Sequence, residues 1–115
     1  MEAVSATLTF RENTVDSRGM TTVRRLVIDV LKPHDPPLID FTERITAQHT
    51  VVGVTASLVE RDKEVQNVKL TIEGDGIDYE SVQEAVEELG ASVHSVDEVS
   101  CGERIIEERA TFQDR

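Results

Sequence analysis

The alternation of apolar and polar positions is most regular over residues 23–32. The even-numbered apolar positions of this stretch would share one face of a strand, because successive side chains point to opposite sides: Leu26, Ile28 and Val30. Val27 and Leu31 make the second face partly apolar as well. Two apolar faces are typical of a strand at the centre of a sheet, or of one whose second face is covered.

Helical spacing follows this stretch. Pro33 would end the strand, and Pro36 and Pro37 suit the first turn of a helix, where a missing N–H is no loss. Apolar residues then recur at helical spacing at Leu38, Phe41 and Ile45. The pattern predicts a helix over residues 37–49.

Two further alternating stretches flank a charged turn at residues 61–64. The first begins at Val52, and the second ends before Gly74. Their inward-facing positions would be Val54, Ala56 and Leu58 in the first, and Val68, Leu70 and Ile72 in the second. This pattern predicts a β-hairpin with one buried face and one polar face.

A second helix is predicted to begin after Asp78, a residue type that caps helix N-termini. Its buried stripe would consist of Val82, Ala85, Val86 and Leu89. Gly90 suits the position just beyond the helix end. A last strand is expected over residues 92–100.

The order strand, helix, strand, strand, helix, strand indicates an α+β protein with the ferredoxin-like βαββαβ sandwich. Its four-stranded antiparallel sheet would have the order 4-1-3-2, with two helices on one face. The chain would divide into a flexible N-terminal extension (residues 1–19), a ferredoxin-like domain (residues 20–102) and a C-terminal tail (residues 103–115).

The sheet face away from the helices would carry four residues of the first strand: Arg25, Val27, Asp29 and Leu31. An uncovered face with a valine and a leucine at its centre favours an interface between subunits, so the expected partner is a second copy of the chain. The alternative is a solvated face that tolerates two apolar residues.

Charge narrows the range of partners. The chain has 115 residues, the size of one domain, with 23 acidic and 12 basic residues and a formal net charge of −11. Such a surface repels phosphates, so no nucleic-acid partner is expected. The dispersed carboxylates favour adaptation to high salt over dedicated cation binding, although both interpretations stay open.

The single cysteine, Cys101, excludes an intrachain disulfide and favours a cytoplasmic protein. No apolar run approaches the ~18 residues of a membrane span, so no membrane partner is expected. The N-terminus lacks the apolar core of a signal peptide.

Four segments carry a family resemblance: Leu-Lys-Pro-His-Asp-Pro at 31–36, Ile-Glu-Gly at 72–74, Gly-Ala-Ser-Val-His-Ser-Val-Asp-Glu-Val at 90–99, and Gln-Asp-Arg at 113–115. With them the chain resembles the archaeal domain-of-unknown-function family 211 from about Thr22 to Arg115. The resemblance implies a ferredoxin-like fold and homo-oligomerisation. It brings no established activity, so no catalytic residue is assigned. The acidity of this member suits a salt-loving archaeal source.

In the predicted topology the end of the first strand, the charged turn and the start of the last strand meet at one sheet edge. This edge would gather His34, Asp35, Asp62, Glu64 and His94. His34, Asp62 and His94 are a candidate transition-metal site, and carboxylates alone could hold Ca²⁺ or Mg²⁺. The alternative is that these are ordinary polar groups at the rim.

The favoured function is a non-enzymatic, homo-oligomeric small domain that binds a divalent cation or a small ligand in a regulatory capacity. One alternative is a small enzyme with an active site between subunits, in which His34 or His94 acts as general base. Another is a purely structural assembly component.

Overall fold

The predicted order of elements is confirmed in the computed structural model, which describes residues 22–107. The elements are β2 (Val23–Pro33), α1 (Leu38–Thr46), β3 (Val51–Arg61), β4 (Val65–Gly74), α2 (Tyr79–Glu88) and β5 (Ser92–Cys101). α1 connects β2 to β3, and α2 connects β4 to β5. The strands of each pair run parallel to each other, as in a ferredoxin-like βαββαβ chain.

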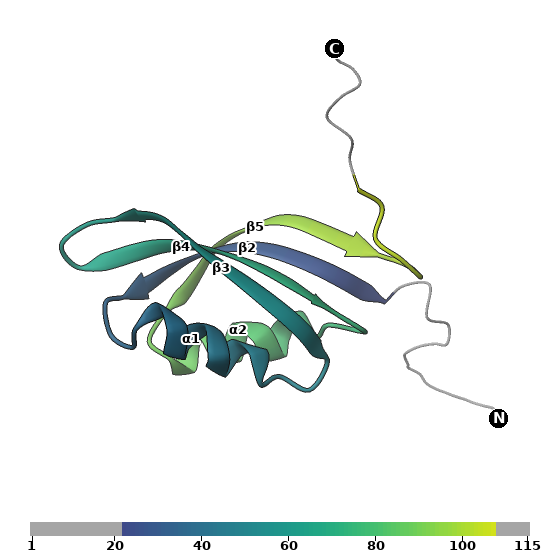
Figure 1. The fold of residues 1–115 in the computed structure, drawn as a ribbon, viewed down its shortest axis with the longest axis horizontal. Helices are drawn as coiled ribbons and strands as arrows, with labels where there is room; N and C mark the ends of the chain where they lie inside the picture. Colours follow the sequence, from purple (N-terminus) through teal and green to yellow (C-terminus); the bar gives the residue numbers. More distant parts are fainter. Residues whose placement is uncertain (1–21, 108–115) are drawn as a thin grey trace, which may run out of the picture.

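β2 occupies an inner position in a four-stranded antiparallel sheet of order β3-β4-β2-β5. This is the predicted 4-1-3-2 order read from the other edge. Ile28 of β2 lies opposite Leu70 of β4 on one side and opposite Val96 of β5 on the other. Both helices pack on the same side of the sheet (Figure 1), so the described residues leave the opposite side open. We call this side the open face.

The core fills the space between the sheet and the helices. The sheet supplies alternate residues of its two inner strands: Leu26, Ile28, Val30, Val68, Leu70 and Ile72. The helices add Phe41, Ile45, Val82 and Val86. All of these side chains are at most 2% exposed, so aliphatic packing with one aromatic ring carries most of the hydrophobic stabilisation.

α2 begins and ends as its sequence predicts. Asp78 precedes the helix in an extended conformation and accepts hydrogen bonds from the Glu80 N–H (3.2 Å) and the Ser81 hydroxyl (2.9 Å). Gly90 follows with a φ of 86°, in the left-handed region that glycine adopts without strain. Local chemistry therefore defines both ends of this helix.

α1 ends at Thr46, so it is shorter than the helix predicted over residues 37–49. The N–H groups of Ala47 and Gln48 bond to carbonyls three residues earlier, at 3.3 and 3.2 Å. Such tighter bonds close the last turn of a helix. The chain then turns at once into β3, where the Val51 N–H donates to the Gln48 carbonyl at 3.1 Å.

The structure describes more of the predicted C-terminal tail than of the predicted N-terminal extension. The flexible extension predicted for residues 1–19 lies outside the described residues. The predicted tail is described as far as Glu107, and it leaves the end of β5 on the side away from the helices (Figure 1). Within residues 22–107, no helix is long and apolar enough to cross a membrane.

Gly74, the last residue of β4, lies against the backbone of Thr50. The Asp75 N–H donates to the Thr50 carbonyl at 3.1 Å, and a Cβ added at Gly74 would clash with that same oxygen. A Cβ added at Gly53 in β3 would meet no heavy atom within 4 Å. The two glycines therefore differ in what a methyl group would meet.

We expect Gly74→Ala to lower the free energy of unfolding by about 1–3 kcal/mol, the usual effect of forcing atoms into a filled space. Gly53→Ala is the matched control and should leave stability unchanged or slightly raised, because the added methyl enters open space. Urea denaturation of the two variants measures both. Equal losses in the two variants would contradict the close approach at Gly74.

Candidate functional site

The open face carries the predicted interface residues of β2. Arg25, Val27, Asp29 and Leu31 alternate with side chains that the core buries, so they lie on the face opposite the helices. Val27 is only 6% exposed within a single chain, whereas the other three are half-buried. The centre of the open face therefore offers less apolar surface than the sequence predicts, because Val27 is already buried within a single chain.

Arg25 is the centre of an ion-pair cluster at one end of this face. Its guanidinium lies 2.7 Å from Glu73 of β4, 3.3 Å from Glu98 of β5 and 2.6 Å from Glu107 of the tail. The hydrogen bonds that Arg25 donates to these carboxylates, the bond to Glu107 foremost, raise the pKa of Arg25. The same contact lowers the pKa of Glu107. The cluster thus joins β2 to β4, to β5 and to the segment that follows β5.

Sequence reasoning missed the partners of Arg25. Glu73 lies directly opposite Arg25 in the pairing of β2 with β4, so a predicted register could have found it. Glu107 is 82 positions away along the chain and belongs to neither a helix nor a strand. No periodic signal marks such a contact.

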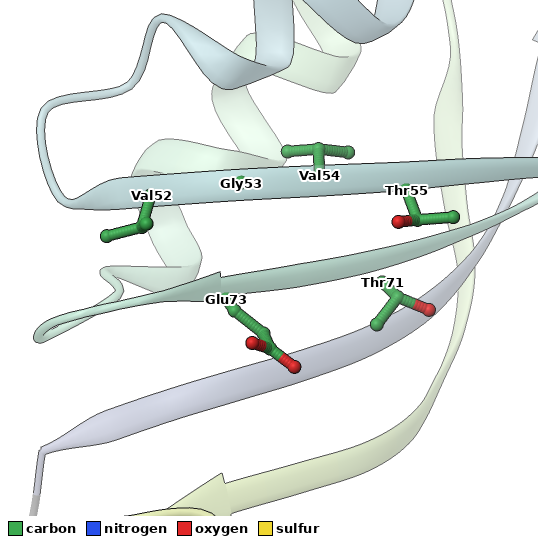
Figure 2. Close-up of a pocket in the computed structure, with 6 residues that line it drawn as sticks. All are labelled: Val52, Gly53, Val54, Thr55, Thr71 and Glu73. Atoms are coloured by element: carbon green, nitrogen blue, oxygen red, sulfur yellow. The ribbon is translucent and has the colours of Figure 1, made fainter.

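A hollow of about 330 Å³ opens beside this cluster between β3 and β4. Figure 2 shows Thr55, Thr71 and Glu73 on one side of the two strands, whereas Val54 points the other way, toward the helices. Gly53 widens the hollow, since no side chain stands there. Its polar walls are hydroxyl and carboxylate oxygens, which suit a cation or a hydrogen-bond donor better than an apolar ligand.

The predicted His34 and Asp62 meet at the opposite end of β2. His34 Nε2 lies 2.9 Å from the backbone oxygen of Asp62, while Asp62 Oδ1 accepts hydrogen bonds from the Glu64 and Val65 N–H groups, each at 2.9 Å. These two N–H groups, that of Val65 first, lower the pKa of the Asp62 carboxyl. The turn therefore keeps an ionised carboxylate beside an imidazole, although the direct contact of the ring is with a carbonyl.

His94 is placed differently. It is an extra residue in β5, between Val93 and Ser95, which pair with Val30 and Asp29 of β2. Over residues 22–107, no three or more His, Cys, Asp or Glu residues gather where they could hold a metal ion. A shared metal site of His34, Asp62 and His94 stays a prediction.

Exposed valines mark both edges of the sheet. Val52 and Val59 are extra residues in β3 that lack a partner in its pairing with β4, and they are 78% and 62% exposed. Val96 and Val99 of β5 are 46% and 51% exposed. Val96 and Val99 are regularly paired with Ile28 and Leu26 of β2. Regular alternation does not predict the bulges at Val52 and Val59.

Lys32 is a buried charge that sequence reasoning did not single out. Its side chain is fully buried, and its Nζ donates to the Pro33 carbonyl at 2.8 Å and to Gln66 Oε1 at 2.9 Å. The ammonium group also lies 5.8 Å from the centre of the Phe41 ring, within reach of a cation–π interaction. Burial lowers the pKa of Lys32, against a smaller opposing effect of Asp35. A signal existed, since Lys32 continues the buried even-numbered positions of β2.

Comparison with known proteins identifies a family and a relative. Residues 24–115 match the model of the family DUF211, described as uncharacterized ArCR. The chain is also similar to the uncharacterized protein MJ0319 of Methanocaldococcus jannaschii, with 47% identity over 96 residues. That alignment covers 84% of this chain and 99% of the relative.

We expect Lys32→Met to leave stability unchanged or higher, because a buried charge is exchanged for an apolar side chain of similar length. Lys32→Ala should lose about 2–4 kcal/mol, since it also removes the packed stem. Thermal melts of both variants check this. Because the folded protein holds the lysine proton less tightly, wild-type stability should rise with pH just below the usual lysine pKa. Lys32→Met should lose that slope, and a slope that persists would contradict the assignment.

Proposed function

The chain belongs to the DUF211 family, and from this premise we propose that it acts as a homo-oligomeric, non-enzymatic module. The observation that carries the proposal is the exposed apolar surface on both edge strands, with Val52 at 78% and Val59 at 62% on β3, and Val96 at 46% and Val99 at 51% on β5. A chain with 38% hydrophobic residues has few to leave in water. Exposed apolar patches at strand edges favour contact with another protein surface.

A second copy is the partner that best suits these edges. The bulges at Val52 and Val59 interrupt the hydrogen-bonding ladder, so contact through side chains is favoured over a sheet that continues from copy to copy. Val96 and Val99 pair with the core-facing Ile28 and Leu26, so their side chains lie on the helix side of β5. Exposed valines on both edges allow each copy to contact two neighbours.

Salt favours such an assembly. Each copy carries a formal charge of −11, so copies repel one another in dilute buffer. The Debye length falls from about 8 Å at 0.15 M to about 3 Å at 1 M, which removes most of this repulsion. The proposal includes adaptation to high salt, and it places the protein in the cytoplasm, where an exposed thiol such as Cys101 stays reduced.

We expect particles larger than 12.8 kDa in sedimentation velocity, with the oligomer growing more stable as salt rises. Val59→Glu and Val96→Glu should each weaken association at least about tenfold, because each would bury an unpaired charge. Ile39→Glu is the control, since Ile39 is 73% exposed but belongs to α1 and to neither edge strand. A monomer at every salt concentration would contradict the proposal, and so would an equal loss in the control.

The proposal also assigns a divalent cation or a small ligand to the His34 edge, in a regulatory role. His34 and the Asp62 turn already lie in contact there, with a hollow of about 220 Å³ beside Asp62 and Leu31. An ionised carboxylate and an imidazole suit a transition metal, whereas the carboxylates of this turn suit Ca²⁺ or Mg²⁺.

Equilibrium dialysis followed by metal analysis tests this assignment. We expect His34→Ala and His94→Ala to reduce the binding of Ni²⁺ or Zn²⁺, whereas binding of Ca²⁺ or Mg²⁺ should depend on Asp62 instead. His49→Ala is the matched control, because His49 is an exposed histidine in the loop between α1 and β3. If the protein binds none of the four cations, or if His49→Ala reduces binding as much as His34→Ala does, the cation is removed from the proposal.

A further inference from the structure

All five N–H donors of the Arg25 guanidinium are engaged. Nε and Nη2 donate to Glu73 Oε2 at 2.9 and 2.7 Å, and Nη1 donates to Glu98 Oε2 at 3.3 Å. The remaining donors of Nη1 and Nη2 reach the two oxygens of Glu107, at 3.1 and 2.6 Å. One donor from each terminal nitrogen thus meets one carboxylate, which is the paired geometry with which arginine recognises any carboxylate.

In the described part of the chain, the segment that delivers Glu107 is hydrogen-bonded at Glu107 itself and, through the backbone, at its start. There the Gly102 N–H donates to the Thr22 carbonyl at 2.8 Å, and Arg24 Nε donates to the Gly102 carbonyl at 2.7 Å. Beyond this point the segment forms neither helix nor strand as far as Glu107, and Ile106 is 85% exposed. We call residues 102–107 the strap. Its far end rests on an exposed ion pair, which salt weakens, so the strap can lift without disturbing the sheet.

A hollow of about 560 Å³ lies where the strap crosses the end of β5. Arg25 and Glu107 line it together with Asp97 and Glu98. When Glu107 moves away, two N–H donors of Arg25 become available to the hollow. This volume lies within the ~300–1,000 Å³ range of small-molecule sites.

The charged groups around this hollow determine which class of ligand it can bind. Without Glu107, one guanidinium faces the carboxylates of Glu73, Asp97 and Glu98, so a simple anion gains one favourable contact against three repulsive ones. A ligand that pairs its carboxylate with an ammonium group satisfies both signs. Ile106 of the strap, which is 85% exposed, adds an apolar side chain to the lining.

We propose that Arg25 is the carboxylate-binding group of a site for a small zwitterion, of the α-amino acid type, and that Glu107 is its built-in, displaceable occupant. The strap is therefore an autoinhibitory latch. A tethered carboxylate competes at an effective concentration on the order of millimolar, so the free ligand must approach that level to displace it. The site lies at the end of β2 opposite His34, and it does not depend on self-association.

The test uses the full-length protein and L-leucine, followed by NMR titration of the arginine side-chain N–H signals at low salt. We expect Glu107→Gln to bind L-leucine about tenfold more tightly than the wild type, because the competing carboxylate is removed. Glu103→Gln is the matched control on the same strap and should bind as the wild type does. Failure of Glu107→Gln to bind L-leucine would overturn the site.

Two analogues test which groups the site recognises. 4-Methylpentanoate lacks the ammonium group of leucine, and isopentylamine lacks its carboxylate. We expect both to bind more weakly than L-leucine. Equal binding of 4-methylpentanoate would overturn the role of the acidic neighbours, and equal binding of isopentylamine would overturn the role of Arg25.

The rate of trypsin cleavage measures the release of the strap independently of ligand binding. Cleavage after Arg104, which lies within the strap, should be faster in Glu107→Gln and in wild type with L-leucine than in wild type alone or Glu103→Gln. Arg25→Lys keeps the charge but loses the paired donors, so it should release the strap and abolish L-leucine binding while the melting temperature shows that the sheet remains folded. Unchanged cleavage in Glu107→Gln would overturn the latch.

Discussion

The inner position of β2 constrains everything else in this molecule. Its backbone is hydrogen-bonded to β4 on one side and to β5 on the other, so its side chains have only the two sheet faces available. The even positions from Leu26 to Val30 are at most 2% exposed under the helices. A shift of one residue would exchange the two faces and would drive Arg25 and Asp29 into the core, where unpaired charges are costly. The register is therefore strongly specified.

The same alternation places the unusual groups of the chain. Arg25 is brought to the open face because Leu26 must be buried, and Lys32 is brought to the core because it follows Val30 by two positions. Lys32 remains tolerable there because Pro33 and Gln66 supply acceptors and Phe41 supplies an aromatic face. Lys32, at the end of the buried stripe, thus contacts residues of β2, β4 and α1 at once.

Sequence reasoning recovered what is local or periodic. The order of elements, the buried stripe of β2, the Asp78 cap and Gly90 all follow from residue spacing within one element. Extra residues in the edge strands could not be found in this way, because a bulge changes the pairing of two strands and leaves little trace in either one. Val59 and His94 are such residues. The partners of Arg25 were missed for a related reason, since Glu107 approaches through a segment without periodicity.

The scarcity of basic residues explains why the two ends of β2 differ. With 23 acidic and 12 basic residues, a guanidinium attracts more carboxylates than it can neutralise, and Arg25 contacts three of them. Its neighbour Arg24 instead holds Gly102 and, at 2.9 Å, Asp75. Two adjacent arginines thus tie β4, β5, the loop after β4 and the strap to the start of β2. The ion pairs of Arg24 with Asp75 and of Arg25 with Glu98 and Glu107 are exposed and respond to salt, whereas the other end of β2 rests on Lys32, which is buried and which salt reaches far less. The end of the sheet that carries the strap is consequently the end where ionic conditions or a competing ligand can change the structure while the core stays intact.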